Sequence, residues 1–347
     1  MDVSAVTRPV VRVAFARMWQ GFDPLDFFVS FLKGIKDEFD FQLAERPDFL
    51  IYGPYGGSLP PVGGAVRVYF GCENVRPDMR ECDWAFSYDH DEVIRHPRHL
   101  RGVFHSGERF VKPALDPSAV RAGKRKFCNF IYGNRVPFRE EFCRRLSAYK
   151  PVDCPGKALN NMPTFDQPGG KPWWESKLDF IADYKFTIAF ENSSHPGYNT
   201  EKIFQPMFVN SVPIYWGDPL IHRDYNPRSF VNYYDVQNRN QFRLAALPLR
   251  WNDPRQPDRK WTLGNRLANR INRWTDQLNQ AVWLHRGFDR LIRRIIELDQ
   301  NDALYEQTLA EPWCHGNRPP DQTAYWARWR EVFHSRPARQ LGTKEPL

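Results

Sequence analysis

The hydrophobic pattern in the first part of the chain predicts short buried β-strands separated by a helix. Apolar runs typical of strands lie at Val10–Ala16, Phe49–Tyr52, Val66–Phe70 and Trp84–Tyr88. Between the first two, the spacing of apolar residues from Pro24 to Phe39 is helical. Strands that alternate with helices favour an α/β fold with a parallel sheet.

A second α/β series follows a looser stretch, rich in prolines and charges, from Arg95 to Lys124. The elements expected in it are a strand at Lys126–Tyr132, helices at Phe138–Tyr149 and Trp174–Asp183, a strand at Phe186–Phe190, a helix at Glu201–Asn210, and strands at Val212–Trp216 and Ser229–Tyr233. Helices dominate from about Leu263 to Leu309. This order predicts two Rossmann-like domains facing a central cleft, over residues 1–120 and 121–262, with a helical C-terminal extension over residues 263–347.

The length and composition support this division. A chain of 347 residues is too long for one ordinary domain, and 41% hydrophobic residues are enough for buried cores. No run of 18 apolar residues occurs, and the arginine-interrupted N-terminus lacks the apolar core of a signal peptide. The six cysteines form no C-x-x-C motif, so we interpret them as reduced structural thiols. We therefore expect a cytoplasmic protein.

The net charge of +8 allows a nucleic acid, an anionic membrane surface or a phosphate-bearing substrate as partner. No nucleic-acid-binding motif is visible, so we expect no nucleic-acid partner. Many arginines lie late in the chain, at helical spacing among apolar residues: Arg266, Arg270, Arg273, Arg286, Arg290, Arg293 and Arg294. This pattern predicts amphipathic helices with a solvated basic face, and a peripheral membrane contact is the alternative.

Candidate chemistry gathers in "FENSSHPGYNTEKIFQ", residues 190–205, at a predicted junction between a strand and a helix. With Thr200 as the N-cap, Glu201 and Lys202 fall in the first helical turn, where free N–H groups and the helix dipole favour a phosphate. Glu201 suits ribose hydroxyls, and Asn192 lies close enough along the chain to contact the same ligand. The alternative is that Glu201 and Lys202 are ordinary residues on a solvated face.

The longer run "FENSSHPGYNTEKIFQPMFVNSVPIYWGDP", residues 190–219, resembles the signature of the α1,3/1,4-fucosyltransferases, glycosyltransferase family ten. The resemblance extends to residues 126–146 and 225–236 and, in the first half, to residues 11–19, 47–56 and 67–89. It implies a GT-B fold with an acceptor-binding N-terminal domain and a GDP-fucose-binding C-terminal domain. It also implies an inverting transfer of L-fucose to the 3-hydroxyl of N-acetylglucosamine in an N-acetyllactosamine-type or related glycan.

The resemblance assigns roles to particular residues. Glu73, in "FGCEN", matches the proposed general base of the family; the alternative for Glu73 is a loop carboxylate that bonds local backbone. Arg139 and Lys202 match the pyrophosphate-binding arginine and lysine. Glu201 matches the ribose-binding glutamate, and Asn192 and Tyr198 match nucleotide-contacting residues.

The resemblance also bears on cofactors and on local structure. Fixed cations can replace a metal ion at a pyrophosphate, so we expect GDP-fucose as donor substrate and no required cofactor.

The alternative for Arg139 is a surface ion pair with Glu140 or Glu141. Pro206 lies inside the helix that follows T-E-K, which predicts a kink or a restart there.

A different reading starts from the D-x-D sequence Asp89-His90-Asp91. In glycosyltransferases of the GT-A fold such a pair of carboxylates holds a divalent metal on the nucleotide diphosphate. A metal-dependent GT-A-like transferase is therefore the alternative function.

Overall fold

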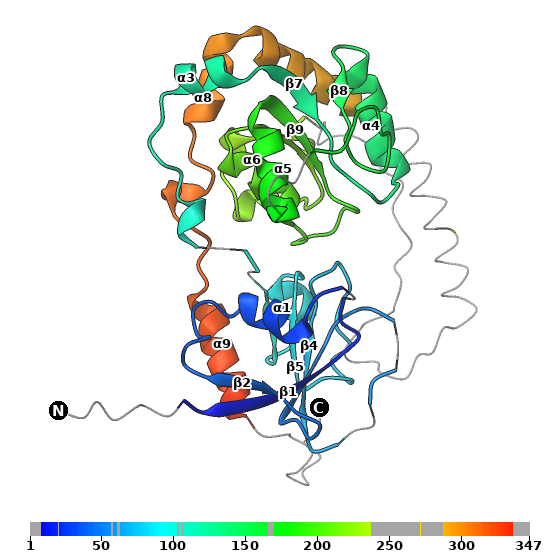
Figure 1. Cartoon of the computed structure of the whole chain (residues 1–347), viewed down its shortest axis with the longest axis vertical. Coiled ribbons are helices and arrows are strands. Elements are labelled where there is room, and N and C mark those ends of the chain that lie inside the picture. Colours follow the sequence, from blue (N-terminus) through cyan, green and yellow to red (C-terminus); the bar gives the residue numbers. More distant parts are fainter. Residues whose placement is uncertain are drawn as a thin grey trace, which may run out of the picture. The chain divides into compact units, whose positions relative to one another are not determined.

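The structure is a computed structural model that describes residues 8–19, 21–56, 58–60, 63–102, 104–105, 107–165, 170–236, 271 and 287–335. The chain forms two compact units, Met1–Ser106 with Pro320–Leu347, and Gly107–Pro319. Each described unit is built on its own parallel sheet (Figure 1).

The first unit holds a six-stranded parallel sheet in the order β2-β1-β3-β4-β5-β6. The strands are β1 (Val10–Ala16), β2 (Asp40–Leu43), β3 (Phe49–Tyr52), β4 (Val66–Phe70), β5 (Trp84–Ser87) and β6 (His99–Arg101). Its helices are α1 (Pro24–Ser30), α2 (Asp91–Ile94) and α9 (Thr323–His334). After β1 the chain adds β2 on one side and then β3 on the other, so the sheet has its topological switch point between β1 and β3.

Helix α9 completes the core of the first unit although it comes last in the chain (Figure 1). Trp329 is fully buried, and its indole stacks on the ring of Phe86 in β5 with centroids 4.0 Å apart. Phe28 of α1 meets the same indole edge-on at 5.2 Å. Aromatic side chains from both ends of the sequence therefore form one core.

The second unit repeats the same topology in a five-stranded parallel sheet, ordered β11-β10-β9-β7-β8. The strands are β7 (Lys126–Asn129), β8 (Val152–Asp153), β9 (Tyr184–Phe190), β10 (Val212–Trp216) and β11 (Val231–Asn232). The α-helices are α3 (Pro117–Gly123), α4 (Pro137–Ser147), α5 (Trp173–Ala182), α6 (Glu201–Phe208), a helix over residues 287–300, and α8 (Asp302–Ala310). Short 3-10 helices are η1 (Glu108–Phe110), η3 (Ile221–Arg223), η4 (Pro227–Ser229) and η5 (His315–Asn317). The switch point of this sheet lies between β7 and β9.

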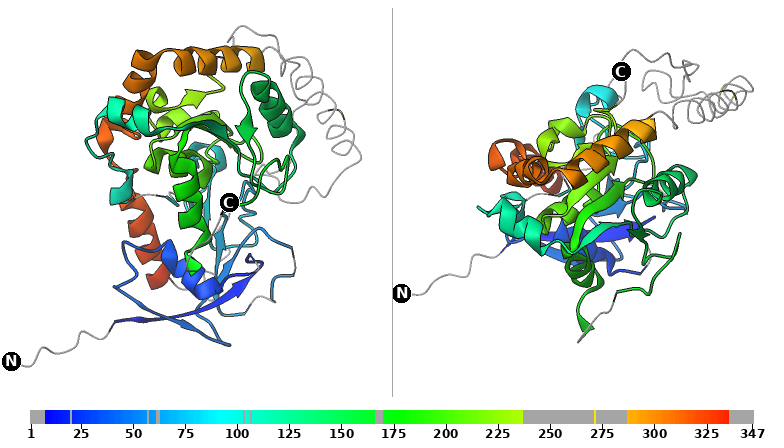
Figure 2. Two further views of the ribbon diagram at one scale, coloured as in Figure 1. Left: turned by 45° about the horizontal axis from the view of Figure 1, so that its top comes forward. Right: turned by 90° about the horizontal axis from the view of Figure 1, so that it is seen from above.

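The helix over residues 287–300 is part of the core of the second unit. Phe288, Leu291 and Ile295 are fully buried in the apolar cluster around β7, β9 and β10. Both views in Figure 2 show this orange helix passing beside α4, where the rings of Phe142 and Phe288 lie 5.1 Å apart. Burial of this apolar stripe explains its helical spacing in the sequence.

The structure confirms the α/β class and most of the predicted strands, with differences at the short elements. The helix predicted from Pro24 to Phe39 ends at Ser30, because the chain turns back to form the edge strand β2. The edge strands β2, β6 and β8 and the helices α2 and α3 were not predicted. Helix α6 continues through Pro206 and ends two residues later, so the helix does not restart at the proline, and a kink there stays a prediction. The predicted domain boundaries at residues 120 and 262 stay predictions.

Candidate functional site

The F-E-N and T-E-K sequences meet at the carboxyl end of β9 through a buried carboxylate. Glu191 follows β9 directly and is fully buried. Its carboxylate accepts hydrogen bonds from the Thr200 amide, at 2.8 Å, and from the Thr200 hydroxyl, at 2.9–3.0 Å. Thr200 is the N-cap of α6, as predicted, but its hydroxyl is used by Glu191 rather than by the helix. Glu191 thereby fixes the start of α6.

Lys202, in the first turn of α6, forms an ion pair with the same carboxylate, with 3.2 Å between Nζ and the Glu191 Oε2. Its Nζ also lies 3.3 Å from a carboxylate oxygen of Glu201. Burial alone would lower the pKa of Lys202, but these two carboxylates outweigh it and raise the pKa above its ordinary value. Lys202 therefore carries a fixed positive charge at the helix start.

Arg139 brings a second positive charge to the end of β9 from the first turn of α4. Its side chain is fully buried, and the guanidinium donates to the backbone carbonyls of Phe190, at 3.2 Å, and Asn134, at 2.6 Å. The guanidinium also lies over the Tyr132 ring, 4.9 Å from the centroid, and its Nε has no hydrogen-bond partner among the described residues. A surface ion pair, the alternative for Arg139, is excluded, because the side chain is buried. Glu140 pairs with Arg135 and Arg144 instead, and Glu141 pairs with Arg145.

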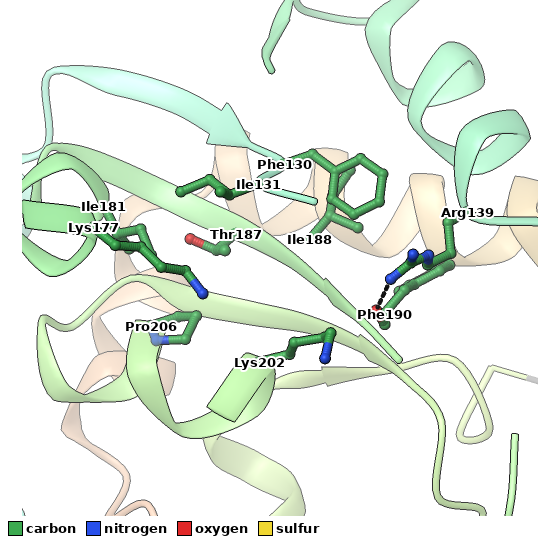
Figure 3. A pocket seen from close by; sticks show the side chains of 10 residues that line it. All are labelled: Phe130, Ile131, Arg139, Lys177, Ile181, Thr187, Ile188, Phe190, Lys202 and Pro206. Carbon is green, nitrogen blue, oxygen red and sulfur yellow. Dashed lines mark hydrogen bonds between the residues drawn. The ribbon is translucent and has the colours of Figure 1, made fainter. Parts of the chain in front are cut away.

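These two cations line a small pocket at the β7/β9 switch point. Its walls are Phe130, Ile131, Arg139, Lys177, Ile181, Thr187, Ile188, Phe190, Lys202 and Pro206. Figure 3 shows Lys177 of α5, Lys202 of α6 and Arg139 of α4 directed toward it. The pocket therefore has an apolar floor and three basic side chains from three different helices.

Lys177 was not predicted from the sequence. It is buried, and in the part of the chain that the structure describes its Nζ has no hydrogen bond or ion pair, although it lies 5.4 Å from the Trp173 ring centroid. Burial lowers its pKa to about 8, opposed by Glu201 and reinforced by the neighbouring Lys202. A buried lysine without an anionic partner is a candidate for binding an anion that is not part of the chain.

The other predicted donor residues lie on the loop and helix that follow β9. Tyr198 is buried, and its phenol is close enough to Arg139 to influence the guanidinium electrostatically. Asn192 is half-buried directly after Glu191, and the Glu201 side chain is 42% exposed at the start of α6. The structure thus brings Arg139, Tyr198 and Lys202 together around Glu191, with Asn192 and Glu201 at the rim of this group.

Glu73 lies in the first unit, three residues after the end of β4. It is half-buried, and its Oε1 accepts a hydrogen bond of 3.0 Å from the hydroxyl of Tyr55. Burial and the adjacent Glu73 charge raise the pKa of Tyr55, so this hydroxyl stays a donor at neutral pH. Glu73 therefore has an oriented carboxylate at the carboxyl edge of the sheet.

The two carboxylates of the D-x-D sequence are both engaged by neighbouring side chains of the first unit. Asp89 is buried and accepts two hydrogen bonds from the Arg76 guanidinium, at 2.9 and 3.1 Å. Asp91 pairs with the ring of His99, whose other nitrogen lies 3.0 Å from the Ser87 hydroxyl. Among the described residues no group of three His, Cys, Asp or Glu side chains is arranged to hold a metal ion. The geometry gives the GT-A alternative no support.

Only three of the seven arginines noted late in the chain lie among the described residues. Arg266, Arg270, Arg273 and Arg286 lie outside the described residues. The helix that carries Arg290, Arg293 and Arg294 buries its apolar side in the core, so its apolar face is not available to a membrane. Within the described residues, no helix combines the length and hydrophobicity needed to span a bilayer.

Two family descriptions match the sequence. "Alpha-(1,3)-fucosyltransferase FucT N-terminal domain" matches residues 13–106, and "Glycosyltransferase family 10 (fucosyltransferase) C-term" matches residues 123–253. The Alpha-(1,3)-fucosyltransferase FucT of Helicobacter pylori is 27% identical over 272 residues, which cover 66% of this chain and 55% of the relative. A GDP-fucose protein O-fucosyltransferase 3 from Bos taurus is 30% identical over 123 residues, 31% of this chain and 26% of the relative. The chain thus spans about half the length of the bacterial relative.

The fold is also that of a solved enzyme. A crystal structure of an alpha1,3-fucosyltransferase with GDP-fucose matches with a TM-score of 0.64 and 21% identity, over 96% of this chain and 94% of that one. This match confirms the GT-B type expected from the sequence. With both family descriptions matching in the expected order, the chain belongs to glycosyltransferase family 10, the fucosyltransferases.

Proposed function

We propose that this chain is an inverting fucosyltransferase that moves L-fucose from GDP-fucose to the 3-hydroxyl of N-acetylglucosamine in an N-acetyllactosamine-type or related glycan. The observation that carries the proposal is the group of basic side chains around Glu191 at the β7/β9 switch point. The names of the bacterial relative and of the structural neighbour support the donor and the linkage.

The donor is held by the second unit. Arg139, Lys177 and Lys202 place three positive charges around the pocket, and one of them is balanced by the buried Glu191. Glu201, on the exposed rim, offsets part of the remaining positive charge, and the rest faces the pyrophosphate of GDP. Because the negative charge on GDP grows as the bond to fucose breaks, fixed cations in a poorly solvated site stabilise the transition state more than the ground state. This group of cations is the reason to propose a reaction without a metal cofactor.

The nucleoside and the sugar are assigned to the rim of the same site. Glu201 has an exposed carboxylate that can accept from ribose hydroxyls, one residue before the pyrophosphate-binding Lys202. Asn192 and Tyr198 complete the contacts to the nucleoside or fucose. Tyr198 is buried close to Arg139, which places its ring beside the pyrophosphate site, where the attached nucleoside or fucose begins.

The acceptor hydroxyl is activated by Glu73. Inversion in one step needs a carboxylate that takes the hydroxyl proton as the new bond forms on the face opposite the leaving group. The hydrogen bond from Tyr55 holds one oxygen of Glu73, which orients the carboxylate before the acceptor arrives. Glu73 is therefore the proposed general base.

The experiment that tests the function is fucose transfer with defined acceptors. The purified chain is incubated with GDP-fucose and either N-acetyllactosamine, its isomer with galactose on the 3-hydroxyl of N-acetylglucosamine, or a folded protein domain with free serine and threonine hydroxyls. We expect transfer to N-acetyllactosamine, with an α1,3 linkage by NMR. Transfer only to the isomer would overturn the linkage, and transfer only to the protein would move the chain toward the activity named in the bovine relative.

A further inference from the structure

Three side chains meet at the carboxyl edge of the first sheet from equivalent positions on three neighbouring strands. Trp19 lies three residues after β1, Tyr55 three residues after β3, and Glu73 three residues after β4. These strands are adjacent and parallel in the order β1-β3-β4, so their loops leave the same edge side by side. The loops after β1 and β3 flank the switch point of this sheet, where α/β proteins bind ligands.

The contacts between these side chains form a continuous chain. The rings of Trp19 and Tyr55 lie 5.8 Å apart at an interplanar angle of 50°, and the Tyr55 hydroxyl donates to Glu73 at 3.0 Å. Phe22 extends the aromatic surface on the far side of Trp19, with ring centroids 6.1 Å apart. Along this chain of contacts the order is therefore the Glu73 carboxylate, the Tyr55 phenol, the Trp19 indole and the Phe22 ring.

The backbone holds the first two loops in register. The amide of Tyr55 donates to the carbonyl of Arg17 at 3.3 Å, and the amide of Gly53 donates to the carbonyl of Ala16 at 3.2 Å. A Cβ on Gly53 would lie 2.6 Å from the Arg17 carbonyl oxygen, so this close approach requires glycine. The relative placement of the Trp19 and Tyr55 rings is thus set by backbone contacts as well as by the side chains.

The outer part of this group is exposed. Trp19 is 52% and Phe22 60% accessible, whereas the aromatic residues of the neighbouring strand β3 are buried. Large aromatic side chains at the surface cost solubility and are typical of binding surfaces. Here they adjoin an oriented carboxylate. A flat apolar ring next to a hydrogen-bonding acid is the chemistry that recognises a pyranose, which has one C–H face and a rim of hydroxyls.

We propose that Trp19, Phe22 and Tyr55 form an aromatic platform for an oligosaccharide acceptor, with Trp19 beneath the sugar next to the one that reacts. This inference rests on the proposed function, because it takes Glu73 as the base. Tyr55, which touches Glu73, lies beside the sugar whose hydroxyl is deprotonated. Trp19 lies one aromatic ring further from Glu73 and contacts the neighbouring sugar, so it gives the enzyme a preference for a disaccharide over a monosaccharide.

The test compares Trp19→Leu, which keeps apolar area but loses the ring, with Trp19→Phe, which keeps a ring. Leu43→Ala is the control, because Leu43 is an equally exposed apolar residue on β2, outside these loops. For each protein we measure kcat/KM with N-acetyllactosamine and with methyl N-acetylglucosaminide, the dissociation constant of GDP-fucose, and binding of the disaccharide by saturation-transfer NMR without donor.

We expect Trp19→Leu to lower kcat/KM for the disaccharide about tenfold, through KM, because a stacking contact is lost. The monosaccharide and GDP-fucose should be affected less than about twofold, and Trp19→Phe should recover most of the loss. Unchanged disaccharide use by Trp19→Leu, or an equal loss for both acceptors, would overturn the proposal. So would a dimer of the wild-type chain that Trp19→Leu dissociates, because the patch would then be an interface between two copies.

The NMR measurement separates this inference from the proposed function. If the wild-type chain transfers no fucose but binds the disaccharide, and Trp19→Leu abolishes that binding, the platform stands and the fucosyltransferase assignment fails. The wild-type chain could instead transfer fucose while the protons of the neighbouring sugar, the one that does not accept fucose, receive no saturation from the protein. In that case the assignment stands and the platform is overturned.

Discussion

Glu191 and Lys202 form a buried ion pair, 3.2 Å from Oε2 to Nζ, that connects the end of β9 to the first turn of α6. The pair explains why the F-E-N and T-E-K sequences occur together. Burial of the charged Glu191 carboxylate costs desolvation free energy and raises the pKa of Glu191. Lys202 and the hydrogen bonds from Thr200 oppose that rise. The carboxylate holds the lysine in place, and the lysine stabilises the carboxylate.

Glu191→Gln should destabilise the second unit by about 3 kcal/mol, because it leaves Lys202 without its buried partner. GDP should then stabilise the variant more than it stabilises the wild type, since a phosphate supplies the missing negative charge. Scanning calorimetry with and without GDP measures both effects. Glu201→Gln is the control: its carboxylate also contacts Lys202 but is 42% exposed, so its loss should cost less than about 1 kcal/mol. Equal GDP shifts in wild type and Glu191→Gln would show that the pair is unrelated to the donor site.

Lys177→Met should weaken GDP binding at pH 7 and stabilise the protein. Burial lowers the pKa of Lys177 to about 8 in the folded protein, whereas the unfolded chain binds its proton up to about pH 10. The folded state therefore bears the cost of a buried charge below pH 8, and stability rises as pH increases from 8 toward 10. Removing the charge should add about 2 kcal/mol at pH 7.

The same titration should appear in ligand binding. In the wild type, the affinity for GDP should fall as pH rises above 8, when Lys177 loses the proton that attracts the phosphate. In Lys177→Met this fall should be absent. Calorimetric titration with GDP from pH 6.5 to 9.5 measures it, after correction for buffer ionisation. A pH profile that is the same in both proteins would exclude Lys177 from the donor site.

Glu73→Gln should lower kcat by a factor of about 10²–10⁴ and leave the dissociation constant of GDP-fucose unchanged, because only the proton acceptor is removed. The amide oxygen can still accept the hydrogen bond from Tyr55, so the loop should keep its shape. Arg139→Ala and Lys202→Ala should instead raise the dissociation constant of GDP. The assignment of roles fails if all three variants lose donor binding equally.

Trp329→Ala should destabilise the first unit by about 3–5 kcal/mol, although the residue lies near the end of the chain. The indole is fully buried against Phe86 and Phe28, and its loss leaves a cavity that the aromatic core cannot close. Trp174→Ala is the control, since Trp174 is 45% exposed and its loss should change stability by less than about 0.5 kcal/mol. A Trp329→Ala protein as stable as the wild type would show that α9 does not contribute to the core of the first unit. That result is expected if residues 263–347 form a separate C-terminal region.

The sequence predicted the strands well because they are continuous apolar runs. Val10–Ala16, Phe49–Tyr52 and Val66–Phe70 are strands with the predicted bounds. The edge strands β2 and β8 were missed because an exposed or two-residue strand has no such run. The packing of α9 on the first sheet was missed for another reason: it depends on contacts between residues about 240 positions apart, such as Phe86 and Trp329, which local pattern cannot show.

The candidate site was predicted in part. Arg139 and Lys202 were identified from their motif, and they lie in one pocket. Glu191 was quoted in that motif but given no role; a glutamate directly after a buried strand and nine residues before a threonine N-cap was the available signal. Lys177 lies on the inner side of α5, and nothing in "WWESKLDF" distinguishes it from a solvated lysine. Its role as a pocket cation depends on burial, which only the structure shows.

Calorimetric titration of the purified chain with GDP-fucose and with UDP-sugars, each with and without EDTA, tests the central claim most directly. We predict that GDP-fucose binds with the same affinity in the presence of EDTA, because Arg139, Lys177 and Lys202 supply the positive charge, and that UDP-sugars do not compete. Binding that requires a divalent metal, or a preference for UDP-sugars, would contradict the account and return attention to Asp89 and Asp91.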